Sequence, residues 1–376
     1  MTDDTDLLPE GLEDRLPREA ATTTRAMRSI QDVMHGHGYD RVLPPMIEFE
    51  KSLASRMAGI QSRRMFRFVD PSSLRMMALR SDFTPQIGRI AQGRLAGAAR
   101  PLRLMYAGQV LTIKGDGLDP AREKLQCGAE LIGADNVAAA IEILIVAIEA
   151  LQAAGARSVS VDFTLPDLVD TLAAKAFPLE PGAIEAVRRE LDTKDAGGLR
   201  DAGGEAYVPL IYATGDFDGA IEKLAAIDAG GALASRIAAL REIAAAIAPT
   251  GARLTLDPSE RHGFEYQSWF GFTLYAEGVR GLLGRGGTYR IAGANAGGEG
   301  EVATGFSLYP DALIDLIAQS EPLSDKVFLP LGHDREVAAR LRSIGWRTAA
   351  ALSEGDSAVS LGCSHTLDGG EVVALA

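Results

Sequence analysis

Short strand-like segments flank a long Ala-rich block, and this arrangement restricts the chain to folds that combine a sheet with an inserted group of helices. From about residue 167 to residue 250, apolar side chains recur at helical spacing. The clearest examples are Ile221, Leu224, Ile227, Leu233, Ile237, Leu240 and Ile243. Strand patterns lie on both sides, at 41–43, 66–69, 76–80, 103–110, 159–163, 253–256, 271–276 and 302–308. The sequence therefore predicts an α+β fold with a helical insertion at about 167–250.

Four helices are predicted outside the insertion. Residues 18–38 carry one apolar face, made by Ala26, Met27, Ile30, Val33 and Met34. A helix over 82–93 tolerates Pro85 in its first turn, where the missing N–H needs no partner. Asp135 or Asn136 can cap a third helix over 137–153, and a fourth covers 311–318. Residues 284–300 are rich in glycine and separate the last two strand patterns.

The pattern changes after Glu321-Pro322. A strand at 326–331, a helix at 334–343, a strand at 346–351 and an alternating pair around 368–370 follow in order. This order of strands and helix predicts a small C-terminal α/β domain. We expect two domains, at 1–320 and 321–376.

Charge and cysteine content exclude several classes of function. The formal net charge is -13, from 51 acidic and 38 basic residues, which disfavours a tRNA partner. Cys127 and Cys363 form no CxxC motif, so no zinc site, metal site or disulfide framework is expected. The acidic N-terminus does not match a signal peptide, and the longest apolar run, 137–151, contains two glutamates. We expect a cytoplasmic protein without a membrane span.

Several stretches, in a fixed order, carry a family resemblance. They are LLPEGLEDRLPREA, GYDRVLPPMIEFE, LRSDFTPQIGR, RLMYAGQVLTIKGDGLDPAREKLQCGAELIG, HGFEYQSWFGFTLY with GRGGTYR, and VATGFSLYPDALI. Over roughly residues 7–318 the chain resembles class II aminoacyl-tRNA synthetases, and histidyl-tRNA synthetase in particular. The resemblance implies an antiparallel sheet flanked by helices. It also implies a homodimer, because Pro45 matches the dimer-interface proline of the first motif.

The resemblance places a histidine-binding pocket on six residues. They are Asp82, Thr84, Gln126, Glu130, Tyr266 and Tyr289. Their carboxylates and hydrogen-bonding groups suit an α-ammonium group and imidazole N–H groups. Simpler interpretations stay open: Asp82 can serve only as a helix cap, Gln126 as a solvated strand residue, and the tyrosines as core aromatics. Glu130 stands in an apolar strand-like context, where a buried carboxylate needs a partner.

The sequence departs from the family mainly at positions where the family binds the nucleotide. Thr112 stands at the arginine position of the second motif and Ala312 at that of the third. Lys114 and Pro310 also depart from the pattern, Gln267 replaces a tyrosine, and either Arg261 or His262 takes the position of the loop arginine. Amino-acid activation brings a carboxylate to a phosphate and needs such cations. The resemblance therefore implies no catalytic residues and no cofactor.

A pocket that keeps its amino-acid contacts and loses its nucleotide contacts resembles the regulatory subunits of short-form ATP phosphoribosyltransferases. That likeness implies a short-form catalytic subunit as partner, a homodimer within a hetero-oligomer, and histidine as effector. The shortened C-terminal domain lacks an extended basic stripe, so tRNA reading is not expected. Two alternatives stay open, an active histidyl-tRNA synthetase and a paralogue that activates amino acids for another acceptor.

Overall fold

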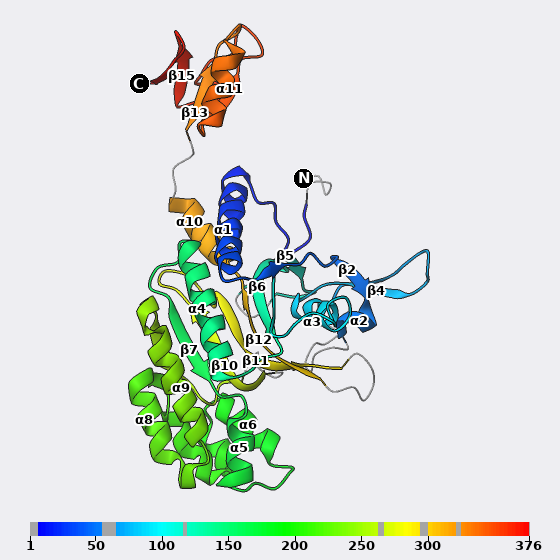
Figure 1. The fold of residues 1–376 in the computed structure, drawn as a ribbon, viewed down its shortest axis with the longest axis vertical. Coiled ribbons are helices and arrows are strands. Elements are labelled where there is room, and N and C mark those ends of the chain that lie inside the picture. Colours follow the sequence, from blue (N-terminus) through cyan, green and yellow to red (C-terminus); the bar gives the residue numbers. More distant parts are fainter. Residues whose placement is uncertain are drawn as a thin grey trace. The chain divides into compact units, whose positions relative to one another are not determined.

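The fold consists of two compact units, Met1–Ala318 and Gln319–Ala376. The computed structural model describes residues 7–54, 65–115, 119–261, 267–293, 300–320 and 325–375 (Figure 1). None of the helices in these ranges is long and apolar enough to cross a bilayer.

A nine-stranded sheet organises the first unit, in the order β1-β5-β6-β12-β11-β10-β7-β9-β8. The strands are β1 (Asp40–Arg41), β5 (Leu102–Leu111), β6 (Glu123–Ile132), β12 (Glu301–Leu308), β11 (Gly284–Ile291), β10 (Gln267–Tyr275), β7 (Ser160–Thr164), β9 (Arg253–Leu256) and β8 (Gly215–Asp216). Neighbouring strands are antiparallel except for two parallel pairs, β1 with β5 and β7 with β9. The predicted antiparallel sheet is thus a mixed one whose central strands are antiparallel.

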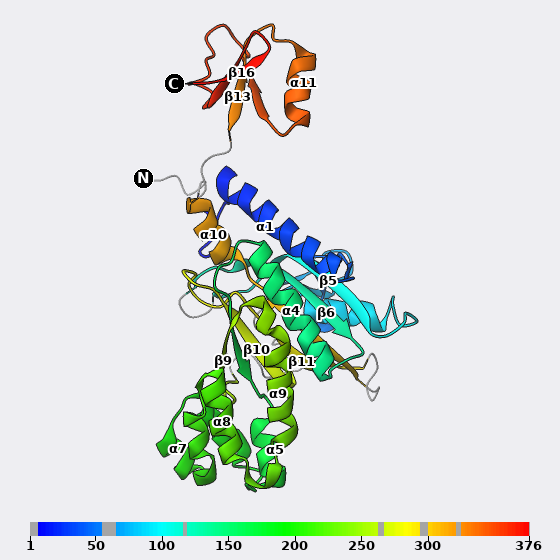
Figure 2. The same cartoon turned by 60° about the vertical axis from the view of Figure 1, so that its left-hand side comes forward.

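Helices cover one face of this sheet. α1 (Pro17–Gly36) and α4 (Val137–Ala153) pack against each other and against the strands, and Figure 2 shows both lying in front of the sheet. The predicted helix over 18–38 is confirmed as α1, which buries Ala26, Ile30 and Met34 as its apolar spacing requires. Asn136 caps α4, because its side chain accepts a hydrogen bond from the Ala139 N–H.

The other face of the sheet carries a smaller hydrophobic cluster. Along β5, Met105 and Ala107 belong to the main core, whereas Leu104 and Tyr106 belong to the second cluster. This alternation places the two clusters on opposite faces. α3 (Thr84–Gln92) covers the second face and supplies Ile87 to the cluster. α2 (Glu50–Ala54) packs against α3 and against a small sheet of β2 (Ile47–Phe49), β3 (Arg67–Val69) and β4 (Met76–Leu79). α10 (Asp311–Ser320) instead contributes Leu313 and Ile314 to the main core.

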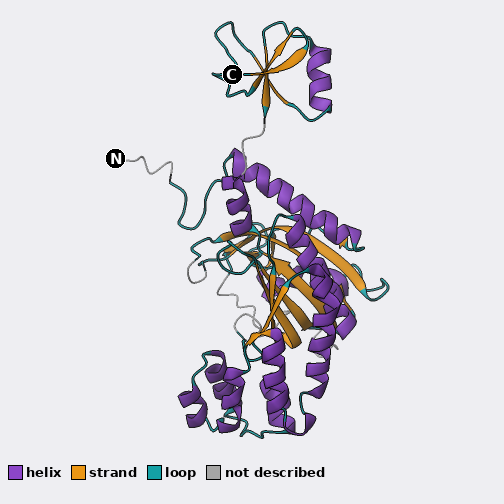
Figure 3. Cartoon of the chain, turned by 90° about the vertical axis from the view of Figure 1, so that its left-hand side faces the viewer, coloured by secondary structure: helices purple, strands orange, loops and turns teal. Residues whose placement is uncertain are grey.

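The helical block expected at about 167–250 lies between the parallel neighbours β7 and β9. It contains α5 (Leu168–Lys175), α6 (Ile184–Asp192), α7 (Ala196–Asp201), η3 (Glu205–Tyr212), α8 (Phe217–Ile227), η4 (Ala229–Gly231), α9 (Ala234–Ile247) and η5 (Ala248–Thr250). Figure 3 shows these helices as a group beside the sheet. Ile221, Leu224, Leu240 and Ile243 are buried in the main core, as their helical spacing predicts.

The second unit has its own sheet, in the order β14-β13-β15-β16. Its elements are β13 (Lys326–Leu329), α11 (Arg335–Ser343), β14 (Arg347–Ala350), β15 (His365–Asp368) and β16 (Glu371–Ala374). Gly369 and Gly370 connect the last two strands at φ values of 56° and 91°, which favour glycine. Val327, Leu329 and Leu341 lie in a separate small core.

The glycine-rich stretch differs from expectation, because its first half is a central strand. β11 pairs with β12 from Gly284 to Ile291 and with β10 on its other side. Backbone hydrogen bonds to two neighbours hold it, and glycines remain where side chains would collide with the adjoining strands.

Candidate functional site

A buried carboxyl group, that of Glu130 on β6, lies at the centre of the candidate site. The Tyr289 hydroxyl donates a hydrogen bond to its Oε2 atom at 2.7 Å. Thr84 Oγ1 and the Tyr106 hydroxyl donate to Oε1 at 3.1 and 3.3 Å. Among the described residues no basic side chain pairs with Glu130, so neutral hydroxyl groups alone satisfy it. A carboxyl in such surroundings favours its protonated form.

The protonation state of Glu130 follows from these surroundings. Burial raises the pKa of its carboxyl to about 8, the hydrogen bond from Tyr289 opposes the rise, and the nearby Asp82 adds to it. Burial therefore favours the protonated form of Glu130 near neutral pH. The group can donate one hydrogen bond and accept others, which suits a ring with one N–H and one lone-pair nitrogen.

A second set of polar contacts links Asp82, Gln126 and Ser307. Gln126 Nε2 donates to Asp82 Oδ1 at 3.0 Å and to Ser307 Oγ at 2.7 Å. Gln126 Oε1 accepts from the Phe83 N–H at 3.0 Å, so both ends of the amide are fixed. Asp82 Oδ1 also accepts from the Thr84 N–H at 2.9 Å, at the start of α3. Asp82 thus bonds to the first turn of α3 as a helix cap would, whereas the interpretation of Gln126 as a solvated strand residue is wrong, because Gln126 is fully buried. Asp82 Oδ2 receives no hydrogen bond from the described residues.

The pocket beside Glu130 adjoins two strand positions, Gly287 and Gly305, where glycine leaves room for the side chains of Gln267 and Glu130. It has an empty volume of about 210 Å³, partly open to solvent. Its lining consists of Thr84, Glu130, Gln267, Arg285, Gly286, Gly287, Tyr289, Gly305, Phe306 and Ser307. A Cβ atom at Gly305 would overlap Glu130 Oε2, and one at Gly287 would overlap Gln267 Oε1. Asp82 and Gln126 stand one hydrogen bond behind the lining residues Thr84 and Ser307.

Five of the six expected site residues come together here. They are Asp82, Thr84, Gln126, Glu130 and Tyr289. Tyr266 and His262 lie outside the described residues. Sequence reasoning missed Tyr106, Ser307 and Arg285. The signal for Tyr106 was its position in β5 opposite Gly128, which puts it on the same sheet face as Gln126 and Glu130.

The positions where the family places its nucleotide-binding arginines hold no cation. Thr112 Oγ1 donates to the Lys114 carbonyl oxygen at 2.8 Å, and Ala312 lies in the first turn of α10. A phosphate here would meet short neutral side chains. Neither position offers the fixed charge that phosphate chemistry needs.

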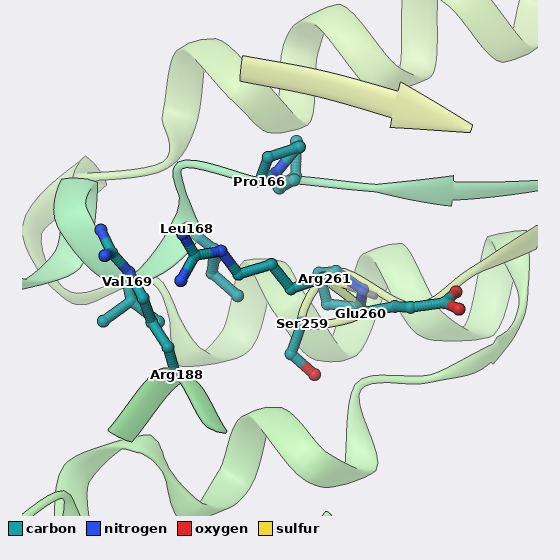
Figure 4. Close-up of a pocket in the computed structure, with 9 residues that line it drawn as sticks. Pro166, Leu168, Val169, Arg188, Ser259, Glu260 and Arg261 are labelled. Atoms are coloured by element: carbon teal, nitrogen blue, oxygen red, sulfur yellow. The ribbon is translucent and has the colours of Figure 1, made fainter. Parts of the chain in front are cut away.

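Arg261 takes part in a different pocket, shown in Figure 4. Its guanidinium approaches Glu185 at 3.3 Å, and its backbone N–H donates to Asp192 Oδ1 at 2.8 Å. Arg188 of α6 also pairs with Glu185, and Asp170 gives it a second carboxylate. This pocket has an empty volume of about 240 Å³ and lies between the helical insertion and the main sheet. Ion pairs between arginine and acidic side chains surround it. Arg261 is therefore engaged with the insertion.

Among the described residues, no group of three or more His, Cys, Asp or Glu side chains is arranged to hold a metal ion. The carboxyl and hydroxyl groups around Glu130 present hydrogen-bond donors and acceptors beside the pocket.

Comparison with known proteins finds relatives that are similar in sequence and in fold over most of the chain. The histidyl-tRNA synthetase family model matches residues 11–313. The ATP phosphoribosyltransferase regulatory subunit of Rhodospirillum centenum is 41% identical, with 97% of this chain and 95% of that protein covered. A solved Bacillus halodurans structure, described as an ATP phosphoribosyltransferase regulatory subunit/histidyl-tRNA synthetase, has a TM-score of 0.80 at 21% identity and covers 96% of this chain and 97% of its own. A chain of the ATP phosphoribosyl transferase (HisG:HisZ) complex from Thermotoga maritima has a TM-score of 0.58 at 18% identity, with 76% and 96% covered.

Proposed function

Because this chain belongs to the ATP phosphoribosyltransferase regulatory subunit family, we propose that it is the non-catalytic chain through which histidine controls a short-form catalytic subunit. One observation supports the proposal: the described residues expected to contact an amino acid come together, while two positions expected to carry nucleotide-binding cations are neutral. Glu130, Thr84 and Tyr289 are hydrogen-bonded together, while Thr112 and Ala312 are neutral. Such a site binds an amino acid and does not activate it.

Histidine fits the pocket in one orientation. Its imidazole ring lies in the pocket beside the Glu130 carboxyl group, where Glu130 and Tyr289 can exchange hydrogen bonds with the two ring nitrogens. Its α-ammonium group lies toward the unused Oδ2 of Asp82. The hydrogen bonds between these side chains and Thr84 or Gln126 hold the groups in place before the ligand arrives.

The absence of adenylate synthesis is the second part of the proposal. Two anions must meet in that reaction, and fixed cations offset their repulsion. Removal of even one neutral hydrogen-bond donor that faces a developing negative charge typically costs about 2.7 to 4 kcal/mol in the transition state. With Thr112 and Ala312 at two of those positions, and Arg261 paired with Glu185, we expect no measurable exchange of pyrophosphate into ATP.

The partner and setting complete the proposal. We expect a homodimer that binds the catalytic chain and transmits histidine occupancy to it as inhibition. The net charge of -13 supports the absence of tRNA binding. Cys127 and Cys363 are both free, in keeping with the reducing cytoplasm.

The test combines assembly, inhibition and binding. We expect the chain to co-purify with the short phosphoribosyltransferase chain of its own organism, and histidine to inhibit the complex. Histidine at 100 times its dissociation constant should stabilise the protein by about 2.7 kcal/mol, seen as a rise in melting temperature. Glu130→Ala should abolish the rise and the inhibition. Glu123→Ala, which changes an exposed carboxylate of the same strand, is the matched control and should keep both.

Histidine-dependent pyrophosphate exchange at synthetase rates would contradict the regulatory role and favour an active synthetase. Failure of the two chains to associate at micromolar concentration would reject the partner.

A further inference from the structure

Arg285 occupies a specific place on the wall of the Glu130 pocket. It lies on β11, directly opposite Ser307 of β12 and Thr273 of β10. Strand alternation puts it on the same sheet face as Gly287 and Tyr289. The side chain is half-buried and lines the pocket.

The guanidinium of Arg285 has no carboxylate partner among the described residues, and it is the one basic side chain in the lining of the pocket. Arg103 and Arg236 are also half-buried, but they pair with Glu142 at 2.7 Å and with Asp167 at 2.6 Å. Arg122 and Arg80 have no carboxylate partner among the described residues and instead donate hydrogen bonds to backbone carbonyl oxygens. A partly desolvated charge is costly without a counter-charge. Arg285 is thus a half-buried cation that forms no ion pair with any of the described residues.

The pocket has two chemically different ends. Glu130 lies opposite Gly305, and Ser307, opposite Arg285, is two residues further along β12. Two strand residues span roughly 7 Å, which matches the scale of an amino acid with an imidazole side chain. The Glu130 end is neutral at pH 7 because burial raises the pKa of the carboxyl to about 8. The Ser307 end combines the Arg285 cation with the Asp82 carboxylate, which bonds to Gln126.

We propose that Arg285 binds the α-carboxylate of the amino acid and makes the pocket specific for free histidine. The inference rests on the proposed histidine-binding function. A guanidinium can hold a carboxylate through two parallel hydrogen bonds, which fixes its orientation as well as its charge. The ammonium group of the same ligand then meets Asp82. The pocket rejects amines, alcohols and esters that share the imidazole ring but lack the carboxylate.

The test compares two ligands on three variants of the full chain by isothermal titration calorimetry. L-Histidinol keeps the imidazole and the ammonium group but carries a hydroxymethyl group in place of the carboxylate. The wild type should prefer histidine over histidinol by about 10- to 100-fold, the usual effect of a hydrogen bond to a charged group. Arg285→Gln should bind both ligands within about 3-fold of each other, and Arg285→Lys should fall between. Arg290→Gln, an exposed arginine of the same strand, should keep the wild-type preference.

The outcomes separate the two proposals. Retained histidinol binding by Arg285→Gln shows that the variant has folded and that the pocket is intact. A wild-type preference in Arg285→Gln, or an equal loss of both ligands, would overturn the role of Arg285 and leave the histidine function standing. A wild type that binds neither ligand would overturn both.

Discussion

Replacement of Glu130 by glutamine should change how the stability of the protein depends on pH. The folded protein keeps the Glu130 proton up to about pH 8, while the unfolded chain loses it near pH 4.5. Because the folded pKa is the higher one, this group's contribution to stability is fully present below pH 4.5. It is lost as the pH rises toward 8. Glutamine has the shape of the protonated acid and does not titrate, so Glu130→Gln lacks this loss.

The size of the effect follows from the difference in bound protons. Where the folded state holds one proton more than the unfolded state, the free energy of unfolding falls by about 1.4 kcal/mol for each pH unit. Between pH 5 and pH 7 the wild type should therefore lose about 3 kcal/mol relative to Glu130→Gln. The difference should level off above about pH 8, where both states of the wild type are ionised.

Urea unfolding at pH 5, 6 and 7 measures this difference directly. The second structural unit is common to wild type and variant, so its contribution cancels in the comparison. Glu123→Gln removes an exposed carboxylate from the same strand and controls for the change in net charge. If the free energy of unfolding changed with pH in the same way in wild type and Glu130→Gln, the prediction that Glu130 is buried and protonated would be refuted.

Two further predictions concern single side chains. Gly305→Ala should abolish histidine binding in calorimetry, because the added Cβ overlaps Glu130 Oε2; Gly182→Ala, with no atom within 4 Å of its Cβ, should bind normally. Retained affinity in Gly305→Ala would place the ligand elsewhere. Asn136→Ala should lower the free energy of unfolding by about 1 kcal/mol in urea denaturation, because α4 loses its N-terminal cap. Unchanged stability would contradict this role of the cap.

The fold was predictable where one local pattern dominates. The apolar stripe of α1 and the spacing of Leu240 and Ile243 in α9 state which face is buried, and both faces are buried in the structure. β11 was not predictable in the same way, because glycines give a strand no side-chain signal. Its position depends on backbone pairing with β10 and β12, two segments that the local sequence does not link to it.

The site residues likewise divide into those that local sequence could indicate and those that it could not. Gln126 and Glu130 are four residues apart on one strand and therefore share a face, which local sequence can indicate. Tyr106, Ser307 and Arg285 reach the site through the register of neighbouring strands, which a single sequence does not state. Register decides which side chains meet, and it is set by contacts across the whole sheet.

The glycines of the pocket have a consequence for how the site can change. Gly287 and Gly305 leave room for the Gln267 and Glu130 side chains beside the pocket, and every other amino acid at these two positions adds atoms that must displace them. One mutation can thus fill the space, and no mutation at the same positions can widen it. A larger ligand could be admitted only by shortening a side chain of the remaining lining, such as Gln267. The site is easily closed and hard to enlarge.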